Sequence, residues 1–198
     1  MLTIFRKNLS AVFILLLALT LGAALSGCMA QTNGVSVGTL NKPNASPDIV
    51  LSWASEAAVA AYTYDYANYQ TSLQTTSRYF TPGSWKSFMA ALVASGNLTK
   101  IIKNKMTVSA TVIGKPVLLA QGELAGRYSW RIQLPLLVTY QGAKTTTYQQ
   151  SIIVTMLVVR TSPLEGSAGG LGIKQFIALV KPQPAQTQVL SAATTAAN

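Results

Sequence analysis

Hydrophobic and polar positions in the first part of the chain repeat with a helical period. From Asp48 to about Thr75 there is no proline or glycine, and alanine, the best helix former, is frequent. One side of such a helix carries Ile49, Trp53, Ala57, Ala60, Tyr64 and Ala67. The nearly opposite side carries Tyr62, Tyr66, Tyr69 and Leu73. We therefore predict one long helix with a smooth face for a sheet and a tyrosine stripe on its other side.

The segment YTYDYANYQ, residues 62–70, allows two periodicities. Tyr62, Tyr64 and Tyr66 alternate as in a strand, whereas Tyr62, Tyr66 and Tyr69 follow the i, i+4, i+7 spacing of a helix. We favour the helix because a strand does not accommodate the alanine-rich residues just before this segment. The stripe of Tyr62, Tyr66 and Tyr69 then has two interpretations, which are packing under a second helix and a surface for a protein partner.

A second helix is predicted where Thr81 can cap an N-terminus and Pro82 suits the first turn. Gly96 supplies its end. Its apolar residues share one face: Trp85, Phe88, Met89, Leu92 and Val93. We expect this face to pack on the core.

After Lys105 the apolar positions alternate, which predicts strands at 105–113, 116–123, 127–140, 146–160 and 172–180. Gly114-Lys115-Pro116 reads as a bulge or bend within one long strand made of the first two. Hairpin turns are predicted at Leu124-Ala125-Gly126 and Gly142-Ala143-Lys144, and a flexible hairpin loop at 162–172. The sum is an α+β fold, with N-terminal helices packed on a curved four-stranded antiparallel sheet.

The N-terminus has the pattern of a secretory signal, with Arg6 and Lys7 before an apolar run. The run ends in Leu25-Ser26-Gly27-Cys28, which resembles the lipobox of bacterial lipoproteins, and Cys28 is the only cysteine in the chain. We expect cleavage before Cys28 and lipid attachment to it, and the alternative is an uncleaved single-pass inner-membrane anchor. Both place the remaining chain outside the cytoplasm. Met29, next to the cysteine, favours the outer membrane over the inner one.

These patterns divide the chain into four segments. Residues 1–27 read as a lipoprotein signal peptide and 28–47, which are small and polar, as a flexible tether. Residues 48–181 form the folded domain, and 182–198 are a tail whose composition predicts disorder.

The net charge of the chain is positive, but its distribution points to no particular site. The chain is 49% hydrophobic and 10% charged, with a net charge of +10. Removal of Arg6 and Lys7 with the signal leaves +8, a surplus that suggests contact with an anionic surface or partner. The basic residues are dispersed apart from Lys100, Lys103 and Lys105, which we interpret as a solvated connection. Without interleaved aromatic residues, they do not indicate nucleic acid as a partner.

The residue types needed for common catalytic sites are scarce. The chain has no histidine, and its five acidic residues show no catalytic spacing. Asp65 lies among the tyrosines, where it could form a proton-transfer pair with a tyrosine or a plain hydrogen bond to a tyrosine or Arg78. We expect a non-enzymatic protein with no catalytic residues, no metal site and no cofactor.

Several blocks together resemble the DotI/IcmL family, which includes TraM of related conjugation systems. They are WASEAA (53–58), YDYANYQ (64–70), YFTPGSWKSF (79–88), LVASGNL (92–98), GRYSWRIQLPLLVTYQ (126–141) and VTMLVVR (154–160). The resemblance covers roughly residues 49–180. It implies a periplasmic domain of the nuclear-transport-factor-two-like, or cystatin-like, kind.

The resemblance also implies a structural role in a type IVB secretion or conjugal transfer apparatus. The implied partners are other secretion-system subunits or a paralogue, together with self-association. Typical members are held by an inner-membrane helix, and the lipobox here departs from that pattern. A stand-alone envelope lipoprotein that binds a small ligand or lipid in the cavity of the same fold is the alternative function.

Overall fold

The structure, a computed structural model, describes residues 39–142, 147–165 and 167–181. Its helices are α1 (Pro47–Ala61), α2 (Tyr69–Thr76), α3 (Pro82–Ala94) and α4 (Asn97–Lys103). Its strands are β1 (Tyr64–Asp65), β2 (Met106–Val112), β3 (Val117–Leu124), β4 (Arg127–Gly142), β5 (Tyr148–Arg160) and β6 (Leu171–Val180). Short 3₁₀ helices are η1 (Ser77–Tyr79), η2 (Pro163–Glu165) and η3 (Ala168–Gly170). The predicted signal peptide, Cys28 and the predicted disordered tail lie outside these residues.

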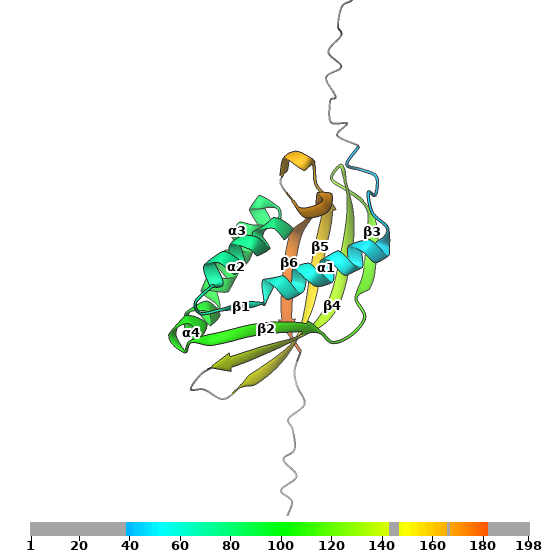
Figure 1. The fold of residues 1–198 in the computed structure, drawn as a ribbon. Coiled ribbons are helices and arrows are strands. Elements are labelled where there is room, and N and C mark those ends of the chain that lie inside the picture. The colour runs from blue at the N-terminus through cyan, green and yellow to red at the C-terminus, as the bar shows by residue number, and fades with distance from the viewer. Residues whose placement is uncertain (1–38, 143–146, 166, 182–198) are drawn as a thin grey trace, which may run out of the picture. The chain divides into compact units, whose positions relative to one another are not determined.

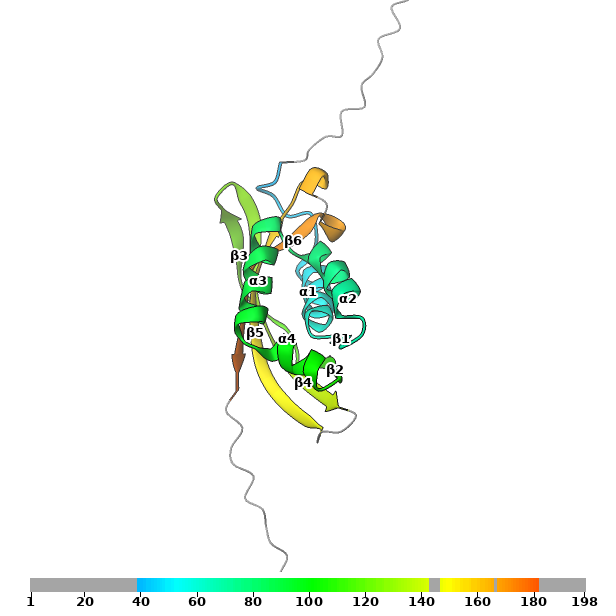
Figure 2. The ribbon, with the colours of Figure 1, turned by 90° about the vertical axis from the view of Figure 1, so that its left-hand side faces the viewer.

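The strands form one antiparallel sheet with β4 near its centre. The order is β1-β2-β4-β5-β6, and β3 also pairs with β4. The predicted α+β class is confirmed, but the predicted number of four strands is wrong, because the described residues form a six-stranded sheet. Figures 1 and 2 show α1 lying across one face of this sheet, which curves toward the helix. Within the described residues, no helix is both long and apolar enough to cross a bilayer.

The predicted bend between β2 and β3 is confirmed, and Pro135 explains it. Both strands pair with β4, one beyond the other, and the gap between them falls opposite Pro135. The Ile113 N–H donates to the Pro135 carbonyl at 3.1 Å. Proline has no N–H to offer a neighbouring strand, so the gap costs β4 no ladder hydrogen bond. A Cβ on Gly114 would lie 3.0 Å from the Pro135 ring, which is why glycine suits the bend.

Helix α1 packs on the sheet through small side chains, as predicted, but not through the predicted set. Its buried residues are Val50, Ala54, Ala57, Ala58 and Ala61. Ile49, which we placed on the packed face, is largely exposed, and Trp53 is only half-buried. The face that meets the sheet is therefore turned by about one residue from the predicted one. Alanine there lets the helix backbone approach the sheet closely.

The predicted single long helix is wrong, because the chain leaves the helix after Ala61. Tyr64 pairs with Val108 of β2, and a turn then leads into α2. The Asp65 carboxylate accepts the N–H groups of Ala67 at 2.7 Å and Asn68 at 2.9 Å, and the Asn68 side chain accepts the Asp65 N–H. Asp and Asn compete with helices through such local bonds. The strand periodicity of this segment, which we rejected, was the better guide at Tyr64.

Helix α3 follows its prediction, beginning at Pro82 after the cap position Thr81. Gly96 has a φ of 68° and lies between α3 and α4, a short helix that we did not predict. The predicted apolar face of α3 is half-buried rather than fully buried, and Val93, which we placed on it, is exposed. It packs through rings, with Phe88 5.0 Å from Phe80 and 5.4 Å from Phe176 between ring centroids.

The predicted hairpin turn between β3 and β4, and the predicted hairpin connectivity of β5 and β6, are also confirmed, whereas the flexibility predicted for residues 162–172 stays a prediction. Ala125 and Gly126 both have positive φ, as a two-residue hairpin turn between β3 and β4 requires. The connection between β5 and β6 contains η2 and η3, and the two strands are antiparallel as expected. Residues 143–146 of the other predicted turn lie outside the described part.

The close approach of α1 to the sheet predicts that enlarging its small side chains destabilises the domain. Ala57→Leu should lower the free energy of unfolding by about 1–3 kcal/mol, because the fully buried Ala57 has no room for three more carbons. Urea denaturation followed by circular dichroism would measure this. Ser52→Leu, on the exposed side of α1, is the control and should change stability by no more than about 0.5 kcal/mol. Equal effects of the two changes would contradict the packing described here.

Candidate functional site

The structure distributes the three tyrosines of the predicted stripe over three local environments. Tyr62 follows the end of α1 and is half-buried, with its ring centroid 6.2 Å from that of Phe176. Tyr66 lies in the turn after β1 with 41% of its surface exposed. Tyr69 is the first residue of α2 and is half-buried. They do not form a stripe on one helix, because that helix is broken. Of these three tyrosines, Tyr66 is the exposed one.

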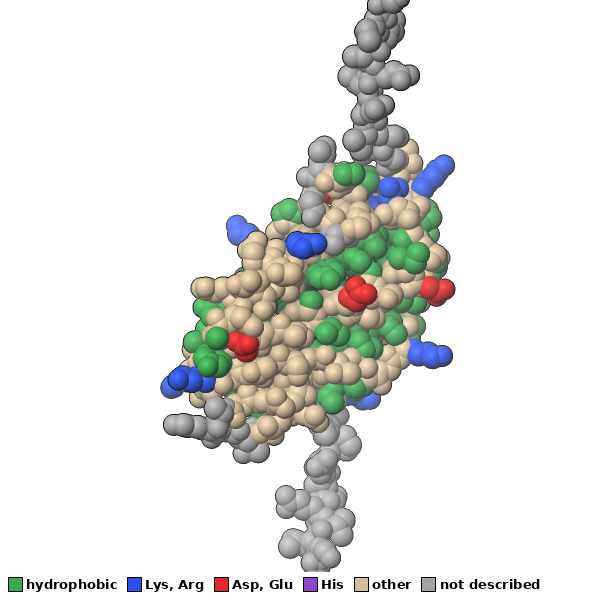
Figure 3. All heavy atoms as spheres, viewed as in Figure 1, with side chains coloured by type: hydrophobic (Ala, Val, Ile, Leu, Met, Phe, Trp, Pro, Cys, Tyr) green, Lys and Arg blue, Asp and Glu red, His purple; other side chains and the backbone are tan. Residues whose placement is uncertain are grey.

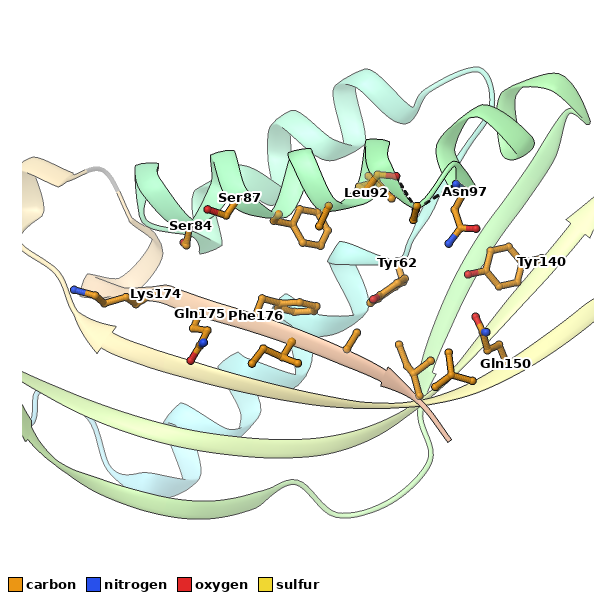
Figure 4. Close-up of a pocket in the computed structure, with 17 residues that line it drawn as sticks. Tyr62, Ser84, Ser87, Leu92, Asn97, Tyr140, Gln150, Lys174, Gln175 and Phe176 are labelled. Carbon is orange, nitrogen blue, oxygen red and sulfur yellow. Dashed lines mark hydrogen bonds between the residues drawn. The ribbon is translucent and has the colours of Figure 1, made fainter. Parts of the chain in front are cut away.

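A groove of about 540 Å³ lies between α3 and β6 (Figure 4). Its lining includes side chains from six elements or their ends, and those that carry the discussion below are Tyr62, Phe88, Leu92, Tyr140, Lys174 and Phe176. Sequence reasoning placed Tyr62 at a candidate site but did not foresee this groove. The residues that form it are separated by up to 118 positions, from Tyr62 to Val180.

Aromatic rings and two phenol groups form the interior of the groove. Phe88 and Phe176 meet edge to face, and in Figure 4 the Tyr140 hydroxyl points toward the Tyr62 side chain. Burial raises the pKa of Tyr140 to about 12, and the neighbouring Tyr148 adds to this rise. Burial, with a smaller contribution from Tyr140, also raises the pKa of Tyr62. Both phenols therefore stay neutral in neutral solution and can donate or accept a hydrogen bond.

Polar side chains line the groove without bringing negative charge to it. Ser84, Ser87, Ser95, Asn97, Gln150 and Gln175 contribute hydroxyl and amide groups. Among the described residues that line the groove, Lys174 alone carries a charge. The groove can therefore hold a partly apolar ligand and would favour an anionic group near Lys174.

One end of β6 is closed by the chain that leads into α3. Phe80 forms a parallel bridge with Ile173, and the Ile173 carbonyl accepts the Thr81 N–H at 3.0 Å and the Ser84 hydroxyl. Beyond Ile173 the pairing of β6 with β5 contains a bulge. The groove begins there and follows the rest of β6.

A second polar cluster lies where the chain enters the domain. One Arg160 nitrogen donates to the carbonyls of Thr39 at 2.7 Å and Lys42 at 2.9 Å. The Tyr128 N–H donates to the Leu40 carbonyl at 2.7 Å. Residues 39–46, predicted as the end of a flexible tether, are thus bonded to the sheet at several points.

Arg127 and Glu165 form a two-pronged ion pair in the same region, with both N–O distances 2.7 Å. The hydrogen bond from Arg127 lowers the pKa of the Glu165 carboxyl. Sequence reasoning missed this pair because 38 positions separate its members and no motif joins them. The pair ties the β5–β6 connection to the first residue of β4.

Charge elsewhere is dispersed, as predicted. On the face that carries α1, acidic and basic side chains lie apart from one another (Figure 3). Lys100, Lys103 and Lys105 are exposed around α4.

The Asp65 carboxylate accepts hydrogen bonds from backbone N–H groups of the turn before α2. Neither a tyrosine nor Arg78 is its partner, contrary to both interpretations above. The described residues contain no group of three or more potential metal ligands.

Comparison with known proteins shows which family the chain belongs to. Residues 30–180 match the family model of DotI and IcmL, described as a type-IV b secretion system inner-membrane complex component. The chain belongs to the DotI/IcmL family. This confirms the resemblance drawn from the sequence blocks. No match is found among curated proteins.

Solved structures of the DotI/IcmL kind agree with this assignment. The chain is 45% identical to the periplasmic domain of DotI, with 70% of this chain and 98% of that one covered and a TM-score of 0.66. An IcmL-like type IV secretion system protein from Legionella pneumophila is 25% identical, with coverages of 73% and 99% and a TM-score of 0.64. A periplasmic fragment of TraM is 29% identical, with coverages of 69% and 98% and a TM-score of 0.62. The nuclear-transport-factor-two-like fold expected of this family is thereby confirmed.

The buried phenols of this DotI/IcmL domain predict a loss of stability in alkali. Unfolded tyrosines titrate near pH 10, whereas the pKa of Tyr140 is about 12 in the folded domain. Between these values the unfolded chain releases a proton that the folded chain keeps. The stability that the folded domain gains from this difference in the Tyr140 pKa is fully present below pH 10. The free energy of unfolding should therefore fall as the pH rises from 10 toward 12. Urea denaturation at a series of pH values would measure it.

Tyr140→Phe removes one of these titrating groups and serves as the control, since lysines also titrate in this range. Its stability should fall less steeply above pH 10 than that of the unchanged domain. Identical slopes for the two proteins would show that Tyr140 titrates like an exposed tyrosine.

Proposed function

We propose that this chain is a non-enzymatic structural component of a type IVB secretion or conjugation apparatus. The observation that carries the proposal is the 45% identity with the periplasmic domain of DotI over 70% of the chain. The family assignment over residues 30–180 supports it. The absence of histidine from the sequence, and of an acidic residue from the described lining of the groove, supports a role without catalysis.

The proposed location is the periplasmic face of the envelope, with a lipid anchor on Cys28. Two observations support it: the lipobox-like Leu25-Ser26-Gly27-Cys28 and the similarity of the following domain to periplasmic domains. We favour the outer membrane because Met29 follows the cysteine. The family description, an inner-membrane complex component, supports the alternative of a single-pass inner-membrane anchor.

A second candidate function rests on the groove between α3 and β6. Its volume of about 540 Å³ and its aromatic interior would suit a lipid chain or a small apolar molecule. In that case the chain would be an envelope lipoprotein that binds a ligand, and its similarity to DotI would reflect the fold alone.

Purification of the full chain from detergent-solubilised envelopes would distinguish the two functions. A structural component should bring other secretion-system subunits, a paralogue or further copies of itself, and deletion of its gene should reduce protein secretion or conjugal transfer. A ligand-binding lipoprotein should instead be isolated alone with a bound small molecule detectable by native mass spectrometry.

The proposed anchor predicts the mass of the mature protein. Intact-mass analysis should show loss of residues 1–27 and the addition of acyl chains at Cys28. Cys28→Ser should abolish both changes and leave the protein unprocessed. A full-length chain without acyl groups would contradict the lipid anchor and support the single-pass alternative.

Tyr66 is the candidate partner residue that the structure leaves exposed. Tyr66→Ser should weaken co-purification with partner subunits, because tyrosine supplies a large contact area at little cost in side-chain entropy. Thermal melting should change little, since the side chain lies on the surface. Tyr66→Phe keeps the ring and should retain partners, and Ile49→Ser, an exposed apolar position on α1, is the control for unspecific loss. Full partner recovery with Tyr66→Ser would remove Tyr66 from the partner surface.

A further inference from the structure

The outer edge of β6 is covered by another segment at its start and has no paired strand of the described chain farther along. At Ile173 it is covered by the segment Phe80–Ser84, as described above. After the bulge, β6 continues to Val180, and no strand of the described chain pairs with its outer side, because β6 ends the sheet order. The groove follows this uncovered stretch, with Phe176, Ile177, Ala178 and Val180 in its lining.

The register shows which backbone groups point outward along this stretch. Residues of an antiparallel strand direct their N–H and C=O groups alternately to one neighbour and away from it. The Lys181 N–H donates to the Ser151 carbonyl of β5 at 2.9 Å. Counting back from Lys181 in register, Leu179, Ile177 and Gln175 also face β5. The N–H and C=O groups of Phe176, Ala178 and Val180 therefore face the groove, where a further strand could pair with them.

This part of the edge lacks the features that usually prevent pairing. Native proteins protect exposed edges with charges, prolines, bulges or a covering segment. From Phe176 to Val180 the sequence is FIALV, which contains no charged residue, proline or bulge, and no segment of the described chain pairs with it; 64% of the Leu179 surface is exposed. The bulge and the covering segment both lie before this stretch. An unprotected edge beside a preformed groove favours a bound strand.

Charge and shape restrict what that strand can be. Side chains of Phe176, Ala178 and Val180 lie on the same side of the sheet as buried Met156, Val154 and Ile152, their partners in β5. A paired strand would place its own inward side chains between β6 and the Phe88–Leu92 side of α3, where small or apolar residues fit. Lys174 and Lys181, both exposed, flank the open stretch at its two ends.

We propose that the groove between α3 and β6 binds a short extended segment of a partner protein, which adds a strand to the sheet at residues 176–180. The segment has small or apolar residues in its centre and acidic residues at its ends, next to Lys174 and Lys181. Backbone hydrogen bonds to Phe176, Ala178 and Val180 hold it, and the side-chain pockets select it. The inference goes beyond the proposed function, because the groove would bind such a segment whichever apparatus contains the chain.

Binding can be measured on the full chain in detergent with two fluorescent peptides, acetyl-DVAVAVD-amide and acetyl-KVAVAVK-amide. The acidic peptide should bind about tenfold more tightly than the basic one. Its two aspartates attract Lys174 and Lys181, whereas the two lysines of the basic peptide repel them. Amide hydrogen exchange of Phe176, Ala178 and Val180 should slow when the acidic peptide is bound. Failure of the acidic peptide to bind, or binding without this protection, would overturn the proposal.

Ala178→Pro tests the backbone contact. It removes an N–H that faces the groove and leaves the hydrogen bonds to β5 in place, so the domain should fold and lose most of its peptide affinity. Ala178→Ser keeps the N–H and should lose far less peptide affinity than Ala178→Pro. A folded Ala178→Pro variant with full affinity would contradict strand pairing.

Charge reversal provides a test that does not depend on proline being tolerated. In the double variant Lys174→Glu, Lys181→Glu the preference should invert, so that the basic peptide binds more tightly than the acidic one. An unchanged preference would place the peptide elsewhere. Protection of the same amides without peptide, increasing with protein concentration, would show that a second copy of this chain occupies the edge and would overturn the proposal, as would a co-purified lipid that blocks peptide binding.

Discussion

Strand β4 determines how the rest of the domain is built. It has 16 residues, and β2, β3 and β5 all pair with it directly. Its buried residues alternate along one face, from Trp130 to Tyr140, and this face meets the small side chains of α1. Because β2 and β3 share the other edge of β4 and separate at Pro135, the sheet bends at that point. The bend lets one continuous sheet pass beneath a helix, which buries the alanine face of α1.

The strands could be predicted well from the sequence because their signals are local. Alternation in RYSWRIQL, two positive-φ turn residues at Ala125-Gly126 and proline at 135 each act within a few residues. Segment 62–68 could not be predicted in the same way. Its tyrosines fit a helix by spacing, but Tyr64 gains a strand partner that lies 44 positions away. Together with the local bonds of Asp65 and Asn68, that distant contact outweighs helix propensity.

The groove illustrates a different limit of sequence reasoning. Tyr62 was singled out for its place in a stripe, yet its neighbours in the structure are Phe176 and Tyr140, which no periodicity connects to it. The ring cluster around Phe80 likewise joins α3 to the last strand. Side chains from opposite ends of the domain form the site, so it exists only after the sheet has closed on the helices. The ends of β6 differ for the same reason, since the covering segment at Ile173 comes from the distant residues 80–84.

The contacts of Arg160 fix residues 39–42 to the domain, which would shorten the tether proposed to follow Cys28. If lipid is attached at Cys28, the chain is fixed again at Thr39, whose carbonyl Arg160 binds. The eleven residues from 28 to 39 can span at most about 36–40 Å when fully extended. A tether that ran free to Pro47 would reach about 25–30 Å farther. With lipid on Cys28, the contacts of Arg160 would thus limit how far the domain could lie from the bilayer, and partners would have to meet it within that distance.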